Sequence, residues 1–215
     1  MPEIYLDHAA TTPVRDEVRN AMASALEENF GNPSSNHRWG RRATAELDES
    51  RGRVAIAIGA EPDEIYFVRG GTESDNLAIL GRAEIFEKRG KTPFVVVSAL
   101  EHKAVLESSA RVEERGGRRV VLPVEENGTL DLDMLENALS DGPTVVSVMT
   151  VNNEVGIRLP LEKVAEQTGS HGVVLHSDAV QALGKIPVRV DAPHVDLLTL
   201  TGHKIGGPRG IGVLY

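Results

Sequence analysis

Lys204 is the residue whose surroundings most directly suggest chemistry. The sequence Thr-Gly-His-Lys at 201–204 follows the apolar run 195–200 and precedes a glycine-rich turn. Burial at the end of such a strand lowers the pKa of a lysine, so the neutral amine becomes available for a Schiff base. An isolated lysine more often caps a strand and extends its ammonium group into water. The other polar residues at strand ends therefore decide between these two interpretations.

Gly71 and Thr72 connect an apolar run to a helical pattern, and they could form a phosphate cradle. Glycine allows a tight backbone turn, and the first N–H groups of a helix can bind an anion. The segment Gly-Gly-Thr-Glu at 70–73 matches neither the dinucleotide fingerprint nor the Walker A loop. Taken alone, it is equally a plain turn followed by a helix cap.

Three further polar residues follow apolar runs, namely His102, Asn153 and Asp178. An imidazole at position 102 could stack on a planar ring or transfer protons. The simpler interpretation is a histidine that caps the next helix or faces water. Likewise, Asn153 suits a turn and Asp178 suits an N-cap without any further function.

Together these residues match the needs of one cofactor. Pyridoxal phosphate requires a lysine, a phosphate cradle, an acidic partner for its ring nitrogen and a group against the face of its ring. The chain offers, in that order, Lys204, Gly71 with Thr72, Asp178 and His102. The sequence therefore predicts a pyridoxal 5′-phosphate site.

Composition narrows the remaining possibilities. The formal net charge of −9 argues against a nucleic-acid-binding surface, for which a basic patch is expected. No apolar stretch is long enough to cross a membrane and no signal-peptide pattern is present, so we expect a cytoplasmic location. The chain contains no cysteine, which excludes disulfides and a cysteine nucleophile within it. The histidines lack the spacing of metal ligands, so we expect no metal site.

Short apolar runs alternate with amphipathic stretches, a pattern typical of β–α units on a largely parallel sheet. Strands are predicted at 65–68, 94–98, 120–123, 144–149, 173–176, 195–200 and 211–215. Helices are predicted at 14–28, 38–58, 73–89, 103–115, 132–140 and 161–168. The runs at 94–97 and 145–149 do not alternate with polar residues, so we expect them to be buried on both faces. Ligands bind such sheets at the carboxyl ends of the strands, where the candidate residues lie.

The candidate residues belong to longer motifs that run through nearly the whole chain. They read Tyr-Leu-Asp-His-Ala-Ala-Thr-Thr-Pro at 5–13, Gly-Asn-Pro-Ser-Ser at 31–35, Gly-Gly-Thr-Glu-Ser-Asp-Asn at 70–76, Glu-His-Lys-Ala-Val at 101–105, Val-Asn-Asn-Glu-Val-Gly at 151–156, Asp-Ala-Val-Gln at 178–181 and Thr-Gly-His-Lys at 201–204. In these motifs the chain resembles the class V group of fold-type I pyridoxal-phosphate enzymes, and within it the cysteine desulfurases of the NifS/IscS type.

The resemblance implies an α/β fold, the large domain of fold-type I pyridoxal-phosphate-dependent transferases. Its mostly parallel seven-stranded sheet is flanked by helices. Residues 1–14 would form an N-terminal segment and residues 15–215 the cofactor-binding large domain. The chain stops inside an apolar strand, so we expect this domain to be incomplete at its C-terminal end and the small C-terminal domain to be absent.

The resemblance also assigns a role to each candidate residue. Lys204 would bind the cofactor covalently and later move protons at the substrate carbon, while His102 would stack on the ring and assist proton transfer. Asp178 would pair with the ring nitrogen and Gln181 with the phenolic oxygen. Asn153 would lie near the ring and the substrate carboxylate. The phosphate would be held by Gly71, Thr72, Thr201 and His203.

The activity that the resemblance implies is removal of sulfur from L-cysteine, which gives L-alanine and an enzyme persulfide for iron–sulfur-cluster or thiocofactor assembly. Such enzymes are homodimers that pass sulfur to a scaffold or another acceptor protein. Their catalytic cysteine and a carboxylate-binding arginine lie on a later segment, which this chain lacks, so the activity of this chain alone stays open. Two alternatives also stay open: a class V aminotransferase or other pyridoxal-phosphate lyase, and a non-catalytic fragment that acts as a sulfur-trafficking partner.

Overall fold

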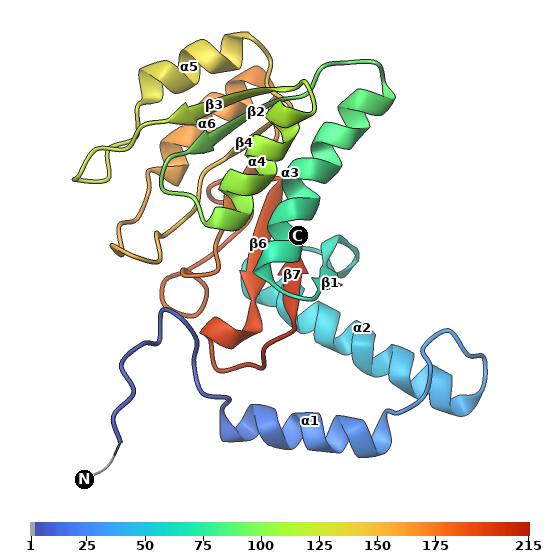
Figure 1. The fold of residues 1–215 in the computed structure, drawn as a ribbon. Coiled ribbons are helices and arrows are strands. Elements are labelled where there is room, and N and C mark those ends of the chain that lie inside the picture. The colour runs from blue at the N-terminus through green and yellow to red at the C-terminus, as the bar shows by residue number, and fades with distance from the viewer. Residues whose placement is uncertain (1–2) are drawn as a thin grey trace.

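A seven-stranded sheet forms the centre of the computed structural model, which describes residues 3–215 (Figure 1). Its strands are β1 (Tyr66–Val68), β2 (Phe94–Ser98), β3 (Arg118–Leu122), β4 (Val145–Ser147), β5 (Leu175–Asp178), β6 (Leu197–Thr201) and β7 (Gly212–Leu214). Their spatial order is β1-β7-β6-β5-β4-β2-β3. Strand β7 runs antiparallel to both of its neighbours, and the other pairs are parallel. The predicted mostly parallel seven-stranded sheet is therefore confirmed.

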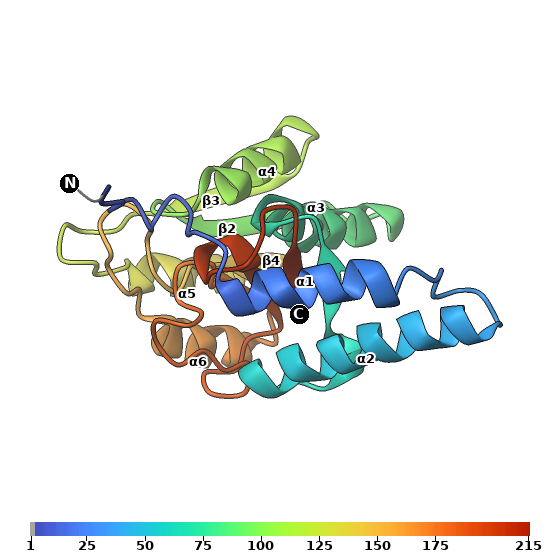
Figure 2. The same ribbon diagram turned by 90° about the horizontal axis from the view of Figure 1, so that it is seen from below.

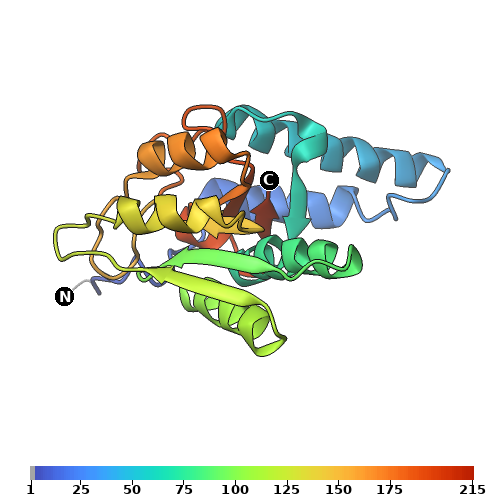
Figure 3. The same cartoon turned by 90° about the horizontal axis from the view of Figure 1, so that it is seen from above.

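Helices cover both faces of this sheet. The helices of the described residues are α1 (Asp16–Glu28), α2 (Arg38–Ile58), α3 (Gly71–Lys88), α4 (Lys103–Glu114), α5 (Leu132–Ser140) and α6 (Leu161–His171), and α1 buries none of its residues. Figures 2 and 3 show α3 and α4 on one face and α5, α6 and the C-terminal end of α2 on the other. Within residues 3–215, none of the helices combines the length and the apolarity that a membrane crossing requires.

The central strands are buried on both faces, as their unbroken apolar runs predict. In β2, Val95 and Val97 pack with residues of α3 and α4, including Ile79. Val96 points to the opposite face and packs with residues of α5 and α6, including Leu135. Each fully buried side chain of this kind contributes about 1.5–3 kcal/mol to folding. The sheet is therefore a rigid platform for the residues at its strand ends.

Several element boundaries differ from the prediction. Strand β3 begins at Arg118, two residues before the predicted start at 120, because its pairing with β2 begins opposite Phe94. Helix α3 begins at Gly71 rather than at 73, so Thr72 lies in its first turn. Strand β5 extends to Asp178, which is its last residue rather than the start of a loop.

Residues of the N-terminal segment lie beside the turn that follows β6. This turn is a short 3₁₀ helix, Gly202–Lys204. The Thr12 backbone N–H donates to the His203 carbonyl at 2.8 Å, and the Arg15 N–H donates to the Gly206 carbonyl at 2.9 Å. These contacts hold the beginning of the chain against its last third, at the carboxyl ends of the strands (Figure 1).

Candidate active site

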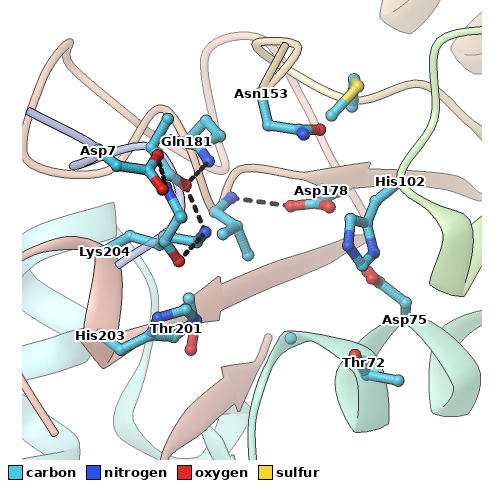
Figure 4. A pocket seen from close by; sticks show the side chains of 15 residues that line it. Asp7, Thr72, Asp75, His102, Asn153, Asp178, Gln181, Thr201, His203 and Lys204 are labelled. Atoms are coloured by element: carbon cyan, nitrogen blue, oxygen red, sulfur yellow. Dashed lines mark hydrogen bonds between the residues drawn. The ribbon is translucent and has the colours of Figure 1, made fainter. Parts of the chain in front are cut away.

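One cavity of about 340 Å³ is lined by every residue that the sequence nominated for the site. These residues are Gly71, Thr72, His102, Asn153, Asp178, Gln181, Thr201, His203 and Lys204. They come from five separate parts of the chain, and Figure 4 shows how they lie around a common space. Asp7, Ala9, Ala10, Asp75, Met149 and Val180 complete the lining.

The amine of Lys204 lies at one side of this cavity. Its Nζ donates to the carbonyl oxygens of Ala9 and Ala10 at 2.5 and 2.7 Å. Partial burial lowers the pKa of Lys204, and the nearby ammonium of Lys185 lowers it further, while Asp178 and Asp7 act in the opposite direction. The neutral amine, which is the nucleophilic form, is therefore more populated here than in a fully exposed lysine.

Asp178 is a buried acid at the end of β5. Its carboxylate accepts a hydrogen bond from the Val180 N–H at 2.8 Å. Burial raises the pKa of Asp178, while that hydrogen bond and the charges of His102 and Lys204 favour the ionised form. A carboxylate has more acceptor capacity than one hydrogen bond uses. Asp178 can therefore accept a further hydrogen bond from a cationic N–H in the cavity.

Gln181 lies one turn beyond Asp178, with both ends of its amide already engaged. Its Nε2 donates to the Ala9 carbonyl at 2.8 Å, and its Oε1 accepts from Lys185 Nζ at 2.7 Å. An amide nitrogen carries two protons, so one N–H is left for a ligand oxygen in the cavity.

The start of α3 provides an anion-binding surface. No side chain caps its first turn, so backbone N–H groups and the positive end of the helix dipole are available there. A Cβ at Gly71 would lie 3.2 Å from Cγ2 of Val180, so glycine permits the close approach of this turn to the cavity. Thr201 and His203 line the same end of the cavity.

The position of His102 agrees with both interpretations of the sequence, a helix cap and a residue of the site. Its Nδ1 accepts from the Ala104 N–H at 3.2 Å and so caps α4. The ring nevertheless lines the cavity, and Figure 4 shows it and the Asn153 amide directed into it. The neighbouring Asn152 builds the turn, because its Oδ1 accepts from the backbone N–H groups of Glu154 and Val155.

Some lining groups carried no usable sequence signal. Ala9 and Ala10 act through backbone carbonyls, which residue type does not reveal. Asp75 did carry a signal, because it lies four residues after Gly71 and therefore on the same face of α3. Glu101 lies behind the cavity lining and is buried. Its Oε1 accepts from Ser98 Oγ at 2.7 Å and from the Met149 N–H at 2.6 Å. Burial raises the pKa of Glu101 to about 7.

These features fit pyridoxal phosphate. The cavity combines an amine of lowered pKa, a buried acid with unused acceptor capacity and an uncapped helix start beside a hydroxyl. Those groups match the aldehyde, the ring nitrogen and the phosphate of the cofactor. Among residues 3–215, no group of three or more histidines and acids is placed to hold a metal ion.

Fold and site together define the large domain of a fold-type I pyridoxal-phosphate enzyme. The family model for class-V aminotransferases matches residues 4–215, and the chain belongs to this family. Its members, including cysteine desulfurases, depend on pyridoxal phosphate.

Two curated relatives illustrate the match, and both are cysteine desulfurases. The chain is 45% identical over 213 residues to cysteine desulfurase IscS of Dictyoglomus turgidum, covering 99% of this chain and 54% of the relative. It is 43% identical over 212 residues to IscS of Methanosarcina thermophila, covering 99% of this chain and 52% of the relative. The chain thus spans about half the length of the curated relatives it matches.

Solved structures give the same assignment of the fold. A NifS-like protein superposes with a TM-score of 0.94 at 36% identity, over 100% of this chain and 59% of its own. SspA in complex with cysteine superposes with a TM-score of 0.92 at 34% identity, over 99% of this chain and 61% of its own. The expected fold-type I large domain is therefore confirmed.

Proposed function

We propose that this chain binds pyridoxal 5′-phosphate through Lys204 and is the cofactor-binding part of a cysteine desulfurase that acts on L-cysteine. The observation that carries the proposal is the convergence of Lys204, Asp178 and the uncapped start of α3 on one cavity. The similarity to IscS proteins over nearly the whole chain favours L-cysteine as the substrate.

The cofactor, when bound, supplies an electron sink for the bonds around the substrate Cα. Lys204 would hold the cofactor and would then take the proton from Cα, a role that the lowering of its pKa favours. Asp178 stabilises positive charge on the ring nitrogen. His102 covers the ring face, and the amide of Asn153 orients the substrate carboxylate.

The remaining residues fix the position of the cofactor. Gln181 uses its second N–H to hold the phenolic oxygen. The backbone at Gly71, the hydroxyls of Thr72 and Thr201 and the ring of His203 hold the phosphate.

Sulfur transfer then needs a thiol. The C–S bond of L-cysteine breaks, the sulfur joins an acceptor thiol as a persulfide, and the carbon skeleton leaves as L-alanine. No external oxidant is consumed. None of the 215 residues is cysteine, so the acceptor thiol comes from outside this sequence, and activity of these residues alone depends on an added thiol.

The experiment loads the purified chain with pyridoxal phosphate and adds L-cysteine with dithiothreitol as the thiol. We expect a change in the visible absorption of the cofactor and release of L-alanine and sulfide, all absent in Lys204→Ala. Formation of 3-mercaptopyruvate instead would identify an aminotransferase. Failure to bind pyridoxal phosphate at all would contradict the proposal and favour a non-catalytic fragment.

We infer by family likeness that the working protein is a cytoplasmic homodimer that delivers sulfur to an acceptor such as an iron–sulfur scaffold. Light scattering of the cofactor-loaded protein tests the first part, because a dimer has twice the chain mass. A monomer that retains full cofactor affinity would contradict it.

A further inference from the structure

Asp75 is a buried acid at the cavity to which neither family likeness nor the proposed mechanism gives a role. It belongs to α3, is 1% exposed and lines the cavity. Its Oδ1 has no hydrogen-bond partner among the described residues. Buried polar atoms without partners are rare and costly, so the charge state of this carboxyl needs an explanation.

His176 is the histidine beside Asp75, and its own charge state bears on that of Asp75. It lies two residues before Asp178 on the same face of β5 and is fully buried. Burial lowers the pKa of His176 to about 3, so the ring is neutral and carries a single N–H. Its Nδ1 lies 2.8 Å from Ser147 Oγ, and its Nε2 lies 3.0 Å from Thr199 Oγ1.

The hydroxyls around the ring can satisfy the His176 N–H on either nitrogen. Ser147 Oγ also lies 3.4 Å from Glu101 Oε2. Thr199 Oγ1 lies 2.8 Å from Ser74 Oγ, which donates to the Val213 carbonyl at 3.1 Å. With its single proton on either nitrogen the ring is neutral, so His176 supplies no positive charge to balance an anion.

His176 Nε2 lies 3.7 Å from Oδ1 of Asp75, which is too far for a hydrogen bond. If Asp75 were ionised, its charge would lie in a dry site with no hydrogen bond to Oδ1 and a neutral histidine beside it. An unpaired buried charge of this kind is costly. A protonated Asp75 removes that charge. Consistently, burial and the charges of Asp178 and Glu101 raise the pKa of Asp75 to about 9, although the Thr199 hydroxyl opposes the shift.

We propose that Asp75 is a positioning residue that carries a proton at neutral pH, so that Asp178 rather than Asp75 holds the negative charge beside the cofactor ring. Two coupled buried carboxyls do not both ionise. Asp178 accepts a hydrogen bond from the Val180 N–H, whereas Oδ1 of Asp75 accepts none, and this difference assigns the proton to Asp75. The role of Asp178 in this inference rests on the proposed function, whereas the charge state of Asp75 is testable without cofactor.

The test compares wild type with Asp75→Asn, a neutral isostere, in thermal unfolding of the cofactor-free chain at pH 7.5 and pH 9.5. The folded protein keeps the Asp75 proton up to a pKa of about 9, whereas the unfolded chain loses it near 3.8. Rising pH therefore destabilises the wild type over this range. Glu101 and His176, whose pKa values are about 7 and about 3, are present in both proteins, so the comparison between them isolates Asp75. His102 and Lys204, which line the same cavity, are present in both proteins.

We expect the melting temperature of D75N to exceed that of wild type by about 3 °C or more at pH 7.5. The difference in melting temperature should grow toward pH 9, because rising pH lowers the stability of the wild type through Asp75 and has no such effect in D75N. Exposed Asp48 supplies the matched control, because Asp48→Asn should follow the wild type at both pH values. A D75N protein that is less stable than wild type at pH 7.5, or that does not fold, would overturn the proposal. If Asp75 is uncharged, an uncharged side chain of the same shape should be able to replace it.

A second readout uses the cofactor. The dissociation constant of pyridoxal phosphate is measured at pH 7.5 and 9.5, and the ratio of the two values is compared. Ionisation of Asp75 adds a second anion beside the ring, so the ratio should differ between wild type and D75N by at least about threefold. Equal ratios contradict the proposal. If neither protein binds the cofactor, the proposed function fails, while the unfolding experiment still decides the charge of Asp75.

Discussion

Lys204 Nζ lies 2.7 Å from the carbonyl oxygen of Ala10, although the two residues are 194 positions apart in the sequence. The first residues of the chain therefore complete the site that the last strands present. A lysine that donates to two carbonyls is held in place, and its partial burial lowers its pKa. The N-terminal segment consequently affects cofactor binding as well as folding.

Thr12 is the residue through which this effect is most easily tested. Its Oγ1 donates to the His203 carbonyl at 2.9 Å and accepts from the Gly206 N–H at 2.7 Å. Thr12→Val removes both hydrogen bonds while keeping the shape, and should cost about 1–2 kcal/mol of stability. We expect weaker pyridoxal-phosphate binding, measured by absorbance titration. Thr12→Ser keeps the hydroxyl, and equal losses in both variants would contradict the account.

Thr72 should contribute to affinity only through the phosphate. Its side chain lines the cavity at the uncapped start of α3. Thr72→Ala should weaken binding of pyridoxal phosphate by about tenfold, the effect of losing one hydrogen bond to a charged group. Binding of pyridoxal, which lacks the phosphate, should change little. Thr72→Ser should restore most of the affinity, and an equal loss for both ligands would contradict the assignment.

Lys185 should tune the reactivity of Lys204. Its charge lowers the pKa of Lys204, and Lys185→Gln removes that charge. Lys204 then keeps its proton to higher pH, so covalent attachment of pyridoxal phosphate should become slower at pH 7, with its pH–rate profile moved to higher pH. Stopped-flow absorbance measures this rate. Lys163→Gln, on an exposed face of α6, is the control, and an unmoved profile in K185Q would contradict the coupling.

Glu101 should make stability depend on pH. Burial raises its pKa from 4.5 to about 7, so the folded state holds a proton that the unfolded state releases. Stability from this source is present below pH 4.5 and falls as pH rises to 7. Glu101→Gln cannot release that proton, so its melting temperature relative to wild type should rise between pH 4.5 and 7.5. A constant difference across this range would show that Glu101 is ionised throughout.

Glu101→Ala tests the structural side of the same residue. It leaves the Met149 N–H and the Ser98 hydroxyl without their buried acceptor. We expect a loss of about 2–4 kcal/mol in denaturant unfolding. A loss below about 1 kcal/mol would mean that water or another group takes over the acceptor role.

The sequence was informative about the strand ends because of their chemistry. A lysine, an acid and a glycine pair, each placed after an apolar run, predict a shared edge of a parallel sheet, and Lys204, Asp178 and Gly71 do line one cavity. What patterns did not reveal is contact through the backbone. The carbonyls of Ala9 and Ala10 bind Lys204, and no property of alanine indicates this.

Sequence patterns also did not predict the buried hydrogen bonds around His176. His176 shows no ligand spacing, and only packing reveals that its ring joins Ser147 to Thr199. Some strand boundaries differ from the predicted ones for a similar reason. Strand β3 extends back to Arg118 because β2 supplies hydrogen-bond partners there, although the arginine itself favours neither state. Tertiary pairing, which propensity does not contain, determines such ends.

The most direct measurement adds pyridoxal phosphate to the purified chain, reduces the mixture with borohydride and locates the cofactor by peptide mass spectrometry. The account predicts one labelled residue, Lys204, with labelling lost in Lys204→Ala and retained in Lys185→Gln. A label on another lysine, or labelling that survives Lys204→Ala, would contradict the central claim that this cavity holds the cofactor.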